Sequence, residues 1–253
     1  METIEDQRLY RIVKSNDLIQ KARFDLSLEE LKVLAFIFSK VKPSDKEFKL
    51  YTFSIVEFCK VCGINQDSGG NYDLVKKTIK GLVDKSFWIA TDNKAITTVS
   101  WINKAWVYQK TGKIKVRLDD DIQKYIIGLH SNFTEYELLS TLPMSSKYSV
   151  RLYEILKSYA YLGNKIITID DLRQMIGIDK KYSSYKDFRT YVLDKAISEI
   201  NLYTDIETEY EAITTGKKIT KILFIIKRRD SWGSFLTGEN CRRVLDGKAV
   251  SDS

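Results

Sequence analysis

One stretch of this chain occurs twice, and the repeat restricts the folds that the chain can adopt. The pattern from Phe53 to Ser86 recurs without a gap 114 residues later, from Ile167 to Ile200. In each copy, apolar residues at helical spacing stand on both sides of a Gly-Ile pair, Gly63-Ile64 and Gly177-Ile178. Glycine readily adopts the left-handed conformation that ends a helix and turns the chain. Each copy is therefore predicted to form a short strand, a helix, a turn and a second helix, which is a helix-turn-helix.

Flanking segments extend each copy to a small domain. A helical pattern precedes each one, from Leu28 to Lys40 and from Lys147 to Tyr159. Runs rich in β-branched and aromatic residues follow and are predicted to be strands, at 87–91, 95–102, 105–109 and 113–118 after the first copy and at 202–208 and 219–227 after the second. Three helices closed by a β-hairpin form a winged helix. The predicted fold class is therefore α+β, with two tandem winged-helix domains, each a three-helix helix-turn-helix core with a β-hairpin wing.

The chain is long enough for two such domains. Its 253 residues allow each domain to bury a core of its own. We place an N-terminal winged-helix domain at 1–135, a C-terminal winged-helix domain at 136–230 and a tail, predicted to be flexible, at 231–253. The join falls near 128–143, where residues 133–142 are also compatible with a helix.

Composition favours a cytoplasmic protein without cofactors. The sequence shows no signal-peptide pattern and no apolar run of about 18 residues, so we expect no membrane contact. Three cysteines do not make a disulfide framework. Cys59 and Cys62 form a C-x-x-C, but a structural zinc needs four ligands, and Cys241 and His130 are far away in the sequence. No metal site and no cofactor are predicted.

Cations gather on the predicted elements with which a winged helix meets a duplex. The chain carries 41 Lys and Arg against 34 Asp and Glu, a net charge of +7. On the second helix of the first copy, the lysines are predicted to lie opposite a core face of Leu74, Ile79 and Leu82. Such cations attract phosphates by releasing counterions, although each cluster alone is also compatible with a solvated face. The predicted contacts are Lys76, Lys77 and Lys80 on that helix, Lys113, Lys115 and Arg117 on a strand, and Lys217, Lys218, Lys221, Arg228 and Arg229 on the last hairpin.

The second copy carries a different recognition helix, from about Ser184 to Asn201. Its predicted outward side is mixed, with Lys186 and Arg189 in the first turns and then Asp187, Thr190, Tyr191, Asp194 and Ser198. A mixed polar surface suits the reading of base edges, whereas a lysine surface suits phosphates. We therefore expect the second domain to contribute more base discrimination, with Asp187 and Asp194 either at the interface or simply solvated.

Three segments carry a resemblance to a known family. They are Val13 to Ile19 with Leu26-Ser27 and Glu30 to Lys32, then Ser146 to Glu154, and finally Phe188-Arg189 through Val192-Leu193 to Glu199-Ile200-Asn201. Over about residues 8–229 the chain resembles the iteron-binding plasmid replication initiators of the Rep 3 superfamily. The short tail after Arg229 departs from the better-known members.

The resemblance implies a double-stranded DNA-binding protein with tandem winged helices. Monomers would bind direct repeats, the iterons, in a plasmid origin, and dimers would bind inverted repeats and repress the protein's own gene. Origin opening and recruitment of a host helicase or its loader follow from the same resemblance, with the dimer interface in the first domain. It also implies DNA contacts at two helix starts, by Lys147, Ser149 and Arg151 and by Lys186, Arg189 and Thr190.

An enzymatic function is not predicted, and no catalytic residue is assigned. Rolling-circle nickases use a histidine pair beside a nucleophilic tyrosine, and this chain has a single histidine, His130. It also has no Gly-x-x-x-x-Gly-Lys-Ser/Thr loop for nucleotide hydrolysis. Two other functions stay open: a dimeric winged-helix transcriptional repressor without an origin function, and a module that binds proteins.

Overall fold

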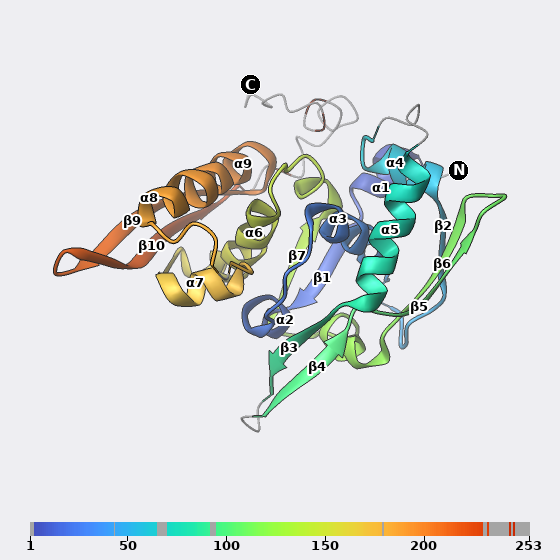
Figure 1. Ribbon diagram of the computed structural model, residues 1–253, viewed down its shortest axis with the longest axis horizontal. Coiled ribbons are helices and arrows are strands. Elements are labelled where there is room, and N and C mark those ends of the chain that lie inside the picture. The colour runs from blue at the N-terminus through green and yellow to red at the C-terminus, as the bar shows by residue number, and fades with distance from the viewer. Residues whose placement is uncertain are drawn as a thin grey trace.

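Figure 1 shows the computed structural model of the chain, which describes residues 3–42, 44–64, 70–91, 95–178 and 180–229 together with Trp232, Arg243 and Leu245. The helices are α1 (Ile4–Arg8), α2 (Asn16–Lys21), α3 (Leu28–Phe38), α4 (Ile55–Val61), α5 (Asn71–Asp84), α6 (Lys147–Tyr159), α7 (Ile169–Met175), α8 (Tyr185–Phe188) and α9 (Lys195–Tyr203). The strands are β1 (Arg11–Ser15), β2 (Tyr51–Ser54), β3 (Ser86–Ala90), β4 (Ile96–Ser100), β5 (Ile102–Tyr108), β6 (Lys113–Leu118), β7 (Phe133–Glu137), β8 (Asn164–Thr168), β9 (Ile206–Thr215) and β10 (Lys218–Arg228). The predicted tail lies outside the described residues, apart from the three named singly.

The repeat forms the predicted helix-turn-helix in both copies. The first copy is β2, α4 and α5, and the second is β8, α7 and a longer helix made of α8, a π-helical segment at Arg189–Asp194, and α9. Gly63 and Gly177 end the first helix of each copy with φ angles of 67° and 73°. These angles lie in the left-handed region that favours glycine, so the kept glycine has the physical role that the sequence predicted.

A three-stranded antiparallel sheet closes each copy. Its order is β2-β6-β5 in the first domain and β8-β10-β9 in the second. The strand before each helix-turn-helix therefore pairs with the second strand of the wing hairpin, and the two wings, β5–β6 and β9–β10, point toward opposite ends of the molecule (Figure 1). A further hairpin, β3–β4, follows α5. Two tandem winged helices are thus the fold, as predicted.

The structure decides one open alternative and corrects one predicted element. Residues 133–142, which were also compatible with a helix, form β7, which pairs along its length with β1 at the other end of the first domain, followed by a short 3-10 helix at Leu138–Ser140. The strand predicted at 202–208 begins only at Ile206, because Leu202 and Tyr203 complete α9 and the Thr204 hydroxyl donates to the Ile200 carbonyl at the end of that helix.

The phase of α5 also differs from the prediction. Leu74 is 45 % exposed, and Val75 is buried in its place. In the second copy Phe188, the counterpart of Leu74 in the ungapped alignment, is buried, whereas Arg189 is exposed. A π-helical segment holds one residue more than a regular turn, and this segment begins directly after Phe188 and contains buried Val192. The buried positions of the two copies therefore coincide from Thr78 and Val192 onward, whereas before that point the buried residue of the second copy stands one position earlier in the alignment.

Helix α6 joins the two domains and is buried on nearly all sides. Ten of its thirteen residues are buried, which is typical of a helix in the centre of a protein. It lies between the two winged helices in Figure 1 and belongs to the same continuous core.

A buried ionic cluster connects α6 to the first domain. The Glu154 carboxylate accepts hydrogen bonds from Lys14 Nζ at 2.5 Å, Tyr136 Oη at 2.6 Å and Arg151 Nη1 at 2.7 Å. All four side chains are less than 10 % exposed. The other terminal nitrogen of Arg151 donates to the carbonyls of Ile19 and Met175, each at 3.1 Å. One guanidinium thus links α6 to α2 of the first domain and α7 of the second.

Burial and the neighbouring charges shift the pKa values of the groups in this cluster. Burial by itself raises the pKa of Glu154, but the positive charges of Lys14 and Arg151 and the hydrogen bonds from Lys14 and Tyr136 outweigh burial and lower that pKa to about 2. Burial lowers the pKa of Lys14 despite the opposing effect of the Glu154 charge and hydrogen bond, and the nearby Arg151 charge lowers it further. The carboxylate is therefore ionised in the folded protein and holds two buried cations.

We predict that Glu154→Gln lowers the free energy of unfolding by about 3–5 kcal/mol, because it leaves two buried cations without a counterion. The control is Glu135→Gln on the neighbouring strand, which removes the exposed pair with Arg11 and costs less than about 1 kcal/mol. Urea denaturation measures both. Similar losses in the two variants contradict the role of the buried cluster.

The same cluster predicts a pH dependence. Its carboxylate has a lower pKa in the folded protein than its ordinary value of 4.5, so its stabilisation is complete above pH 4.5 and is lost as the pH falls through about 2. The difference in unfolding free energy between the unmodified protein and Glu154→Gln should shrink over this interval. A difference that is constant from pH 5 to the acid end of the folded range opposes this assignment.

Gly177 predicts a second, local effect on stability. A Cβ on Gly177 would lie 2.5 Å from the Phe24 carbonyl oxygen of the first domain, whereas a Cβ on Gly163, with a similar φ of 75°, meets no atom within 4 Å. Gly163→Ala should therefore cost only the left-handed strain of about 1 kcal/mol, and Gly177→Ala should cost clearly more. Thermal unfolding of both variants compares them, and equal losses would show that the Phe24 contact can relax.

Candidate nucleic-acid interface

Helix α5 presents its lysines to solvent as predicted. Lys76, Lys77 and Lys80 are exposed, on the side opposite buried Val75, Ile79 and Leu82. Lys80 pairs with Asp84 one turn further along the helix. Within the described part of the chain, Lys76 and Lys77 have no carboxylate partner, so their charges are available to an anionic ligand.

The first wing presents a second row of cations. Lys113, Lys115 and Arg117 alternate along β6 with three buried apolar residues, so they share the solvent face of the sheet. Arg117 pairs with Asp120 at 3.2 Å, and Lys115 Nζ lies 5.4 Å from the ring centroid of Tyr108. This row is on a separate element from the α5 lysines, and it extends the positive surface of the first domain along its wing.

The recognition helix of the second domain exposes Lys186, Arg189, Thr190 and Tyr191. Its π-helical segment begins at Arg189, and such segments occur frequently at functional sites. Arg189, Thr190 and Tyr191 thus fall on the part of this helix that departs from regular geometry, whereas Lys186 lies in α8 just before it.

The two acidic residues predicted on the outward side of this helix, Asp187 and Asp194, are both engaged within the protein. At the start of this helix, the hydroxyl of the N-cap residue Ser184 donates a hydrogen bond to the Asp187 carboxylate at 2.8 Å. Asp194 accepts from Tyr210 of the wing and from Arg189 Nε at 3.3 Å. The Asp194 charge raises the pKa of Arg189, and burial together with Asp194 raises the pKa of Tyr210. Asp194 therefore orients Arg189 and ties the wing to the recognition helix.

A basic groove of about 690 Å³ lies between α7, the start of α8 and the tip of the second wing. Lys217 and Lys218 line it from the wing, as predicted, and Arg173 and Lys180 line it from the helix-turn-helix. Asp170 is the carboxylate among its lining residues. Arg173 and Lys180 were not predicted at an interface. Arg173 stands where the first copy has Cys59, so the change from cysteine to arginine between the two copies could have indicated a basic surface here.

Lys221 is not part of this groove. It lines a different hollow of about 450 Å³ together with Lys21, Arg23 and Lys165. The predicted hairpin cluster is therefore divided, with Lys217 and Lys218 on one side of α7 and Lys221 on the other.

Four predicted contacts need correction or qualification. Ser149 is fully buried and Arg151 is 4 % exposed, because α6 is a central helix, so neither can reach a duplex. Arg229 is half-buried and donates to the carbonyls of Asn201 and Thr204 at the end of α9, whereas Arg228 is exposed. Lys147 pairs with Asp25 of the first domain. We no longer expect Ser149, Arg151 or Arg229 to contact DNA.

The C-x-x-C pair is part of the core. Cys59 and Cys62 are free and buried, and burial raises the pKa of both thiols. Among the described residues there is no group of three or more histidine, cysteine or acidic side chains that could hold a metal ion. Cys241 lies outside the described residues.

No helix in the described ranges is long and apolar enough to span a bilayer.

The fold and its basic surfaces define the chain as a tandem winged-helix DNA-binding protein. Family comparison also finds two winged-helix regions in the chain, in the same order. A family described as "Initiator Replication protein, WH1" matches residues 11–157, and one described as "Initiator Rep protein, WH2" matches residues 168–226. The chain therefore belongs to the plasmid replication initiators of the Rep 3 type.

Curated relatives are similar over part of their length. The chain is 32 % identical over 133 residues to the PI protein of Escherichia coli, covering 45 % of this chain and 43 % of the relative. It is 21 % identical over 206 residues to a replication initiation protein of Escherichia coli, covering 78 % and 63 %. The chain thus spans less than two thirds of either relative.

Solved structures show weaker likeness. The WH1 domain of MSBI1.176, a replication protein, aligns with a TM-score of 0.29 at 14 % identity, over 37 % of this chain and 72 % of that one. Domains 2 and 3 of RctB align with a TM-score of 0.47 at 12 % identity, over 80 % and 82 %.

Proposed function

We propose that this protein initiates plasmid replication by binding double-stranded direct repeats, the iterons, in a plasmid origin. The observation that carries the proposal is the pair of unlike recognition helices held in one chain. Helix α5 offers lysines, and the helix from Tyr185 to Tyr203 offers Arg189, Thr190 and Tyr191 in a mixed polar setting. Two different reading surfaces suit a long asymmetric site that is repeated head to tail, and do not by themselves favour a palindrome.

The mechanism is binding without bond chemistry. Each recognition helix enters a major groove, while the wings and the groove lined by Lys217 and Lys218 hold neighbouring phosphates. Because Asp194 fixes the Arg189 side chain, the second domain contributes base discrimination, and the first contributes sequence-independent attraction. Occupied adjacent repeats then bend the duplex and ease the opening of A·T-rich DNA nearby.

Further steps belong to the same proposal. Residues 1–135 grip phosphates and dimerise, and residues 136–230 read the sequence. Dimers bind inverted repeats and repress the protein's own gene, and the origin complex recruits a host helicase or its loader. The protein acts in the cytoplasm and needs no catalytic residue or cofactor.

Footprinting of the purified protein on the DNA next to its own gene tests this function. We expect protection of several direct repeats, each about 20 base pairs long, because two adjacent major-groove contacts on one face span about two helical turns. Protection of a lone operator palindrome would instead favour a dimeric repressor without an origin function. Binding without any sequence preference at any salt concentration would oppose both DNA-reading functions.

The division of labour between the domains gives a further prediction. Arg189→Ala should weaken binding to the repeat by about 1–3 kcal/mol and affect nonspecific DNA less, because a base contact is lost. Lys77→Ala should weaken both kinds of binding alike and reduce the slope of log K against log salt by about 1, because one phosphate contact is lost. Titrations at several salt concentrations measure these quantities, and equal effects of the two substitutions would remove the division.

A further inference from the structure

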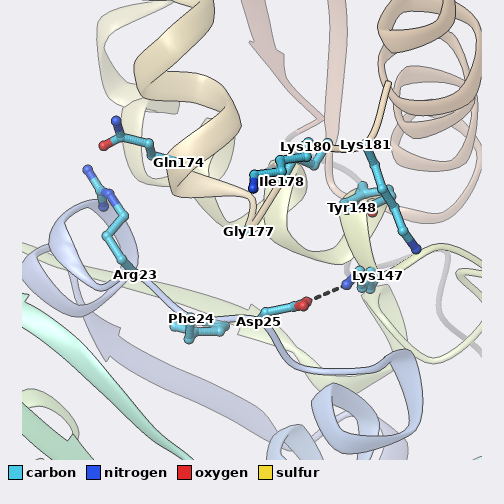
Figure 2. Close-up of a pocket in the computed structure, with 10 residues that line it drawn as sticks. All are labelled: Arg23, Phe24, Asp25, Lys147, Tyr148, Gln174, Gly177, Ile178, Lys180 and Lys181. Atoms are coloured by element: carbon cyan, nitrogen blue, oxygen red, sulfur yellow. Dashed lines mark hydrogen bonds and ion pairs between the residues drawn. The ribbon is translucent and has the colours of Figure 1, made fainter. Parts of the chain in front are cut away.

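A pocket of about 530 Å³ lies where the first domain meets the turn of the second helix-turn-helix (Figure 2). Three segments line it: the chain after α2, the first residues of α6, and the end of α7 with the turn that follows it. Its volume is in the range that holds small organic ligands, and domain interfaces are a preferred place for such sites. Apart from Lys180, its lining residues differ from those of the groove beside the second wing.

The lining combines apolar walls with an excess of positive charge. Phe24, Tyr148 and Ile178 supply apolar surface. Arg23, Lys147, Lys180 and Lys181 supply cations, and the carboxylate among the lining residues, Asp25, is already paired with Lys147. In Figure 2, Arg23 and Gln174 stand at one end of the pocket, and Lys147 and Lys181 stand at the other.

The walls are fixed by contacts within the protein. The Phe24 ring lies edge-on to Trp101 at 4.8 Å, and the Arg151 guanidinium covers it at 4.3 Å. On the opposite wall, Arg173 holds the turn by donating to the carbonyls of Lys181 and Tyr182. The pocket is therefore preorganised from both domains, which reduces the entropy lost when a ligand binds.

An aromatic row connects this pocket to the recognition helix. The Tyr148 ring meets Tyr182 edge-on at 6.1 Å, and Tyr182 stacks on exposed Tyr191 at 5.6 Å. Tyr191 lies in the π-helical segment. A ligand against Tyr148 is thus two ring contacts away from the surface that we propose reads bases.

We infer that this pocket binds a nucleotide, with the base against the Phe24, Tyr148 and Ile178 walls and the phosphates beside Lys180 and Lys181. A planar apolar ring accounts for the walls, and several negative charges account for Lys180 and Lys181, which have no carboxylate partner among the residues that the structure describes. The Gln174 amide can donate and accept hydrogen bonds to a base edge. A free nucleoside triphosphate and a nucleotide within single-stranded DNA share this chemistry. The inference does not depend on iteron binding.

Calorimetric titration of the full chain tests this inference, with adenosine triphosphate, thymidine triphosphate, inorganic tripolyphosphate and a short oligo-thymidylate as probes. We expect saturable binding of one nucleoside triphosphate per chain, tighter than tripolyphosphate. An oligonucleotide that binds more tightly and displaces the triphosphate identifies single-stranded DNA as the source, and an oligonucleotide that does not displace it identifies the free nucleotide. No saturable binding of any nucleotide, or equal affinity for tripolyphosphate, overturns the inference.

Two variants locate the site. The double variant Lys180→Gln with Lys181→Gln changes exposed residues and should weaken nucleotide binding at least about tenfold, because two charge-assisted contacts are lost. The control Lys46→Gln with Lys60→Gln removes the same charge at exposed positions outside the pocket and should change little. Equal weakening in both variants would mean diffuse attraction and no site.

A third variant separates the base from the phosphates. Phe24→Leu keeps an apolar wall but removes the ring, so it should weaken both nucleoside triphosphates and leave tripolyphosphate unchanged. Footprinting of the upstream DNA in parallel shows whether duplex recognition survives, so failure of the pocket and failure of iteron binding give different results.

Discussion

The arrangement of this molecule depends on one buried carboxylate. Glu154 neutralises Lys14 from β1 and Arg151 from its own helix in a place where neither cation could be left alone. The same Arg151 reaches backbone carbonyls in both domains, so the ion cluster also sets the distance between them. Backbone carbonyls cannot move independently of their helices. Buried hydrogen bonds from α6 to α2 and α7 therefore help to fix the relative placement of the two winged helices.

The fixed placement of the two domains determines how their unlike recognition helices can act together. If the domains were loosely joined, two unlike recognition helices would act as two weak binders with an uncertain spacing. In the proposed function, a fixed spacing would let the lysine surface of α5 and the mixed surface around Arg189 bind one continuous duplex. The interface pocket lies beside the same centre, because Phe24 is held by Arg151 and Gly177 packs on the Phe24 carbonyl.

Much of the fold was predictable because the same helix-turn-helix pattern occurs twice in the sequence. Apolar spacing and the kept Gly63 and Gly177 predicted both helix-turn-helix units, and β-branched runs predicted the wings. Pairing partners distant in sequence were not predictable, so β7 was open to a helical interpretation until β1 was seen beside it. The burial of charged side chains was not predictable either, because the sequence alone does not distinguish a buried arginine such as Arg151 from an exposed one. Ser149 and Arg151 were placed at a DNA interface by the family resemblance, and the central position of α6 corrects them.

The π-helical segment at Arg189–Asp194 has a consequence for how such a protein can change its target. Residues after the segment remain tied to the core through Ala196 and Ile200, while residues before it are turned by one position relative to α5. A local change of backbone geometry, within a repeat that aligns without a gap, has thus turned the exposed side chains at the start of this helix and kept the packing that supports them. The two copies therefore differ in backbone conformation as well as in side chains. The direction in which a recognition helix presents its side chains can change without any change in its length.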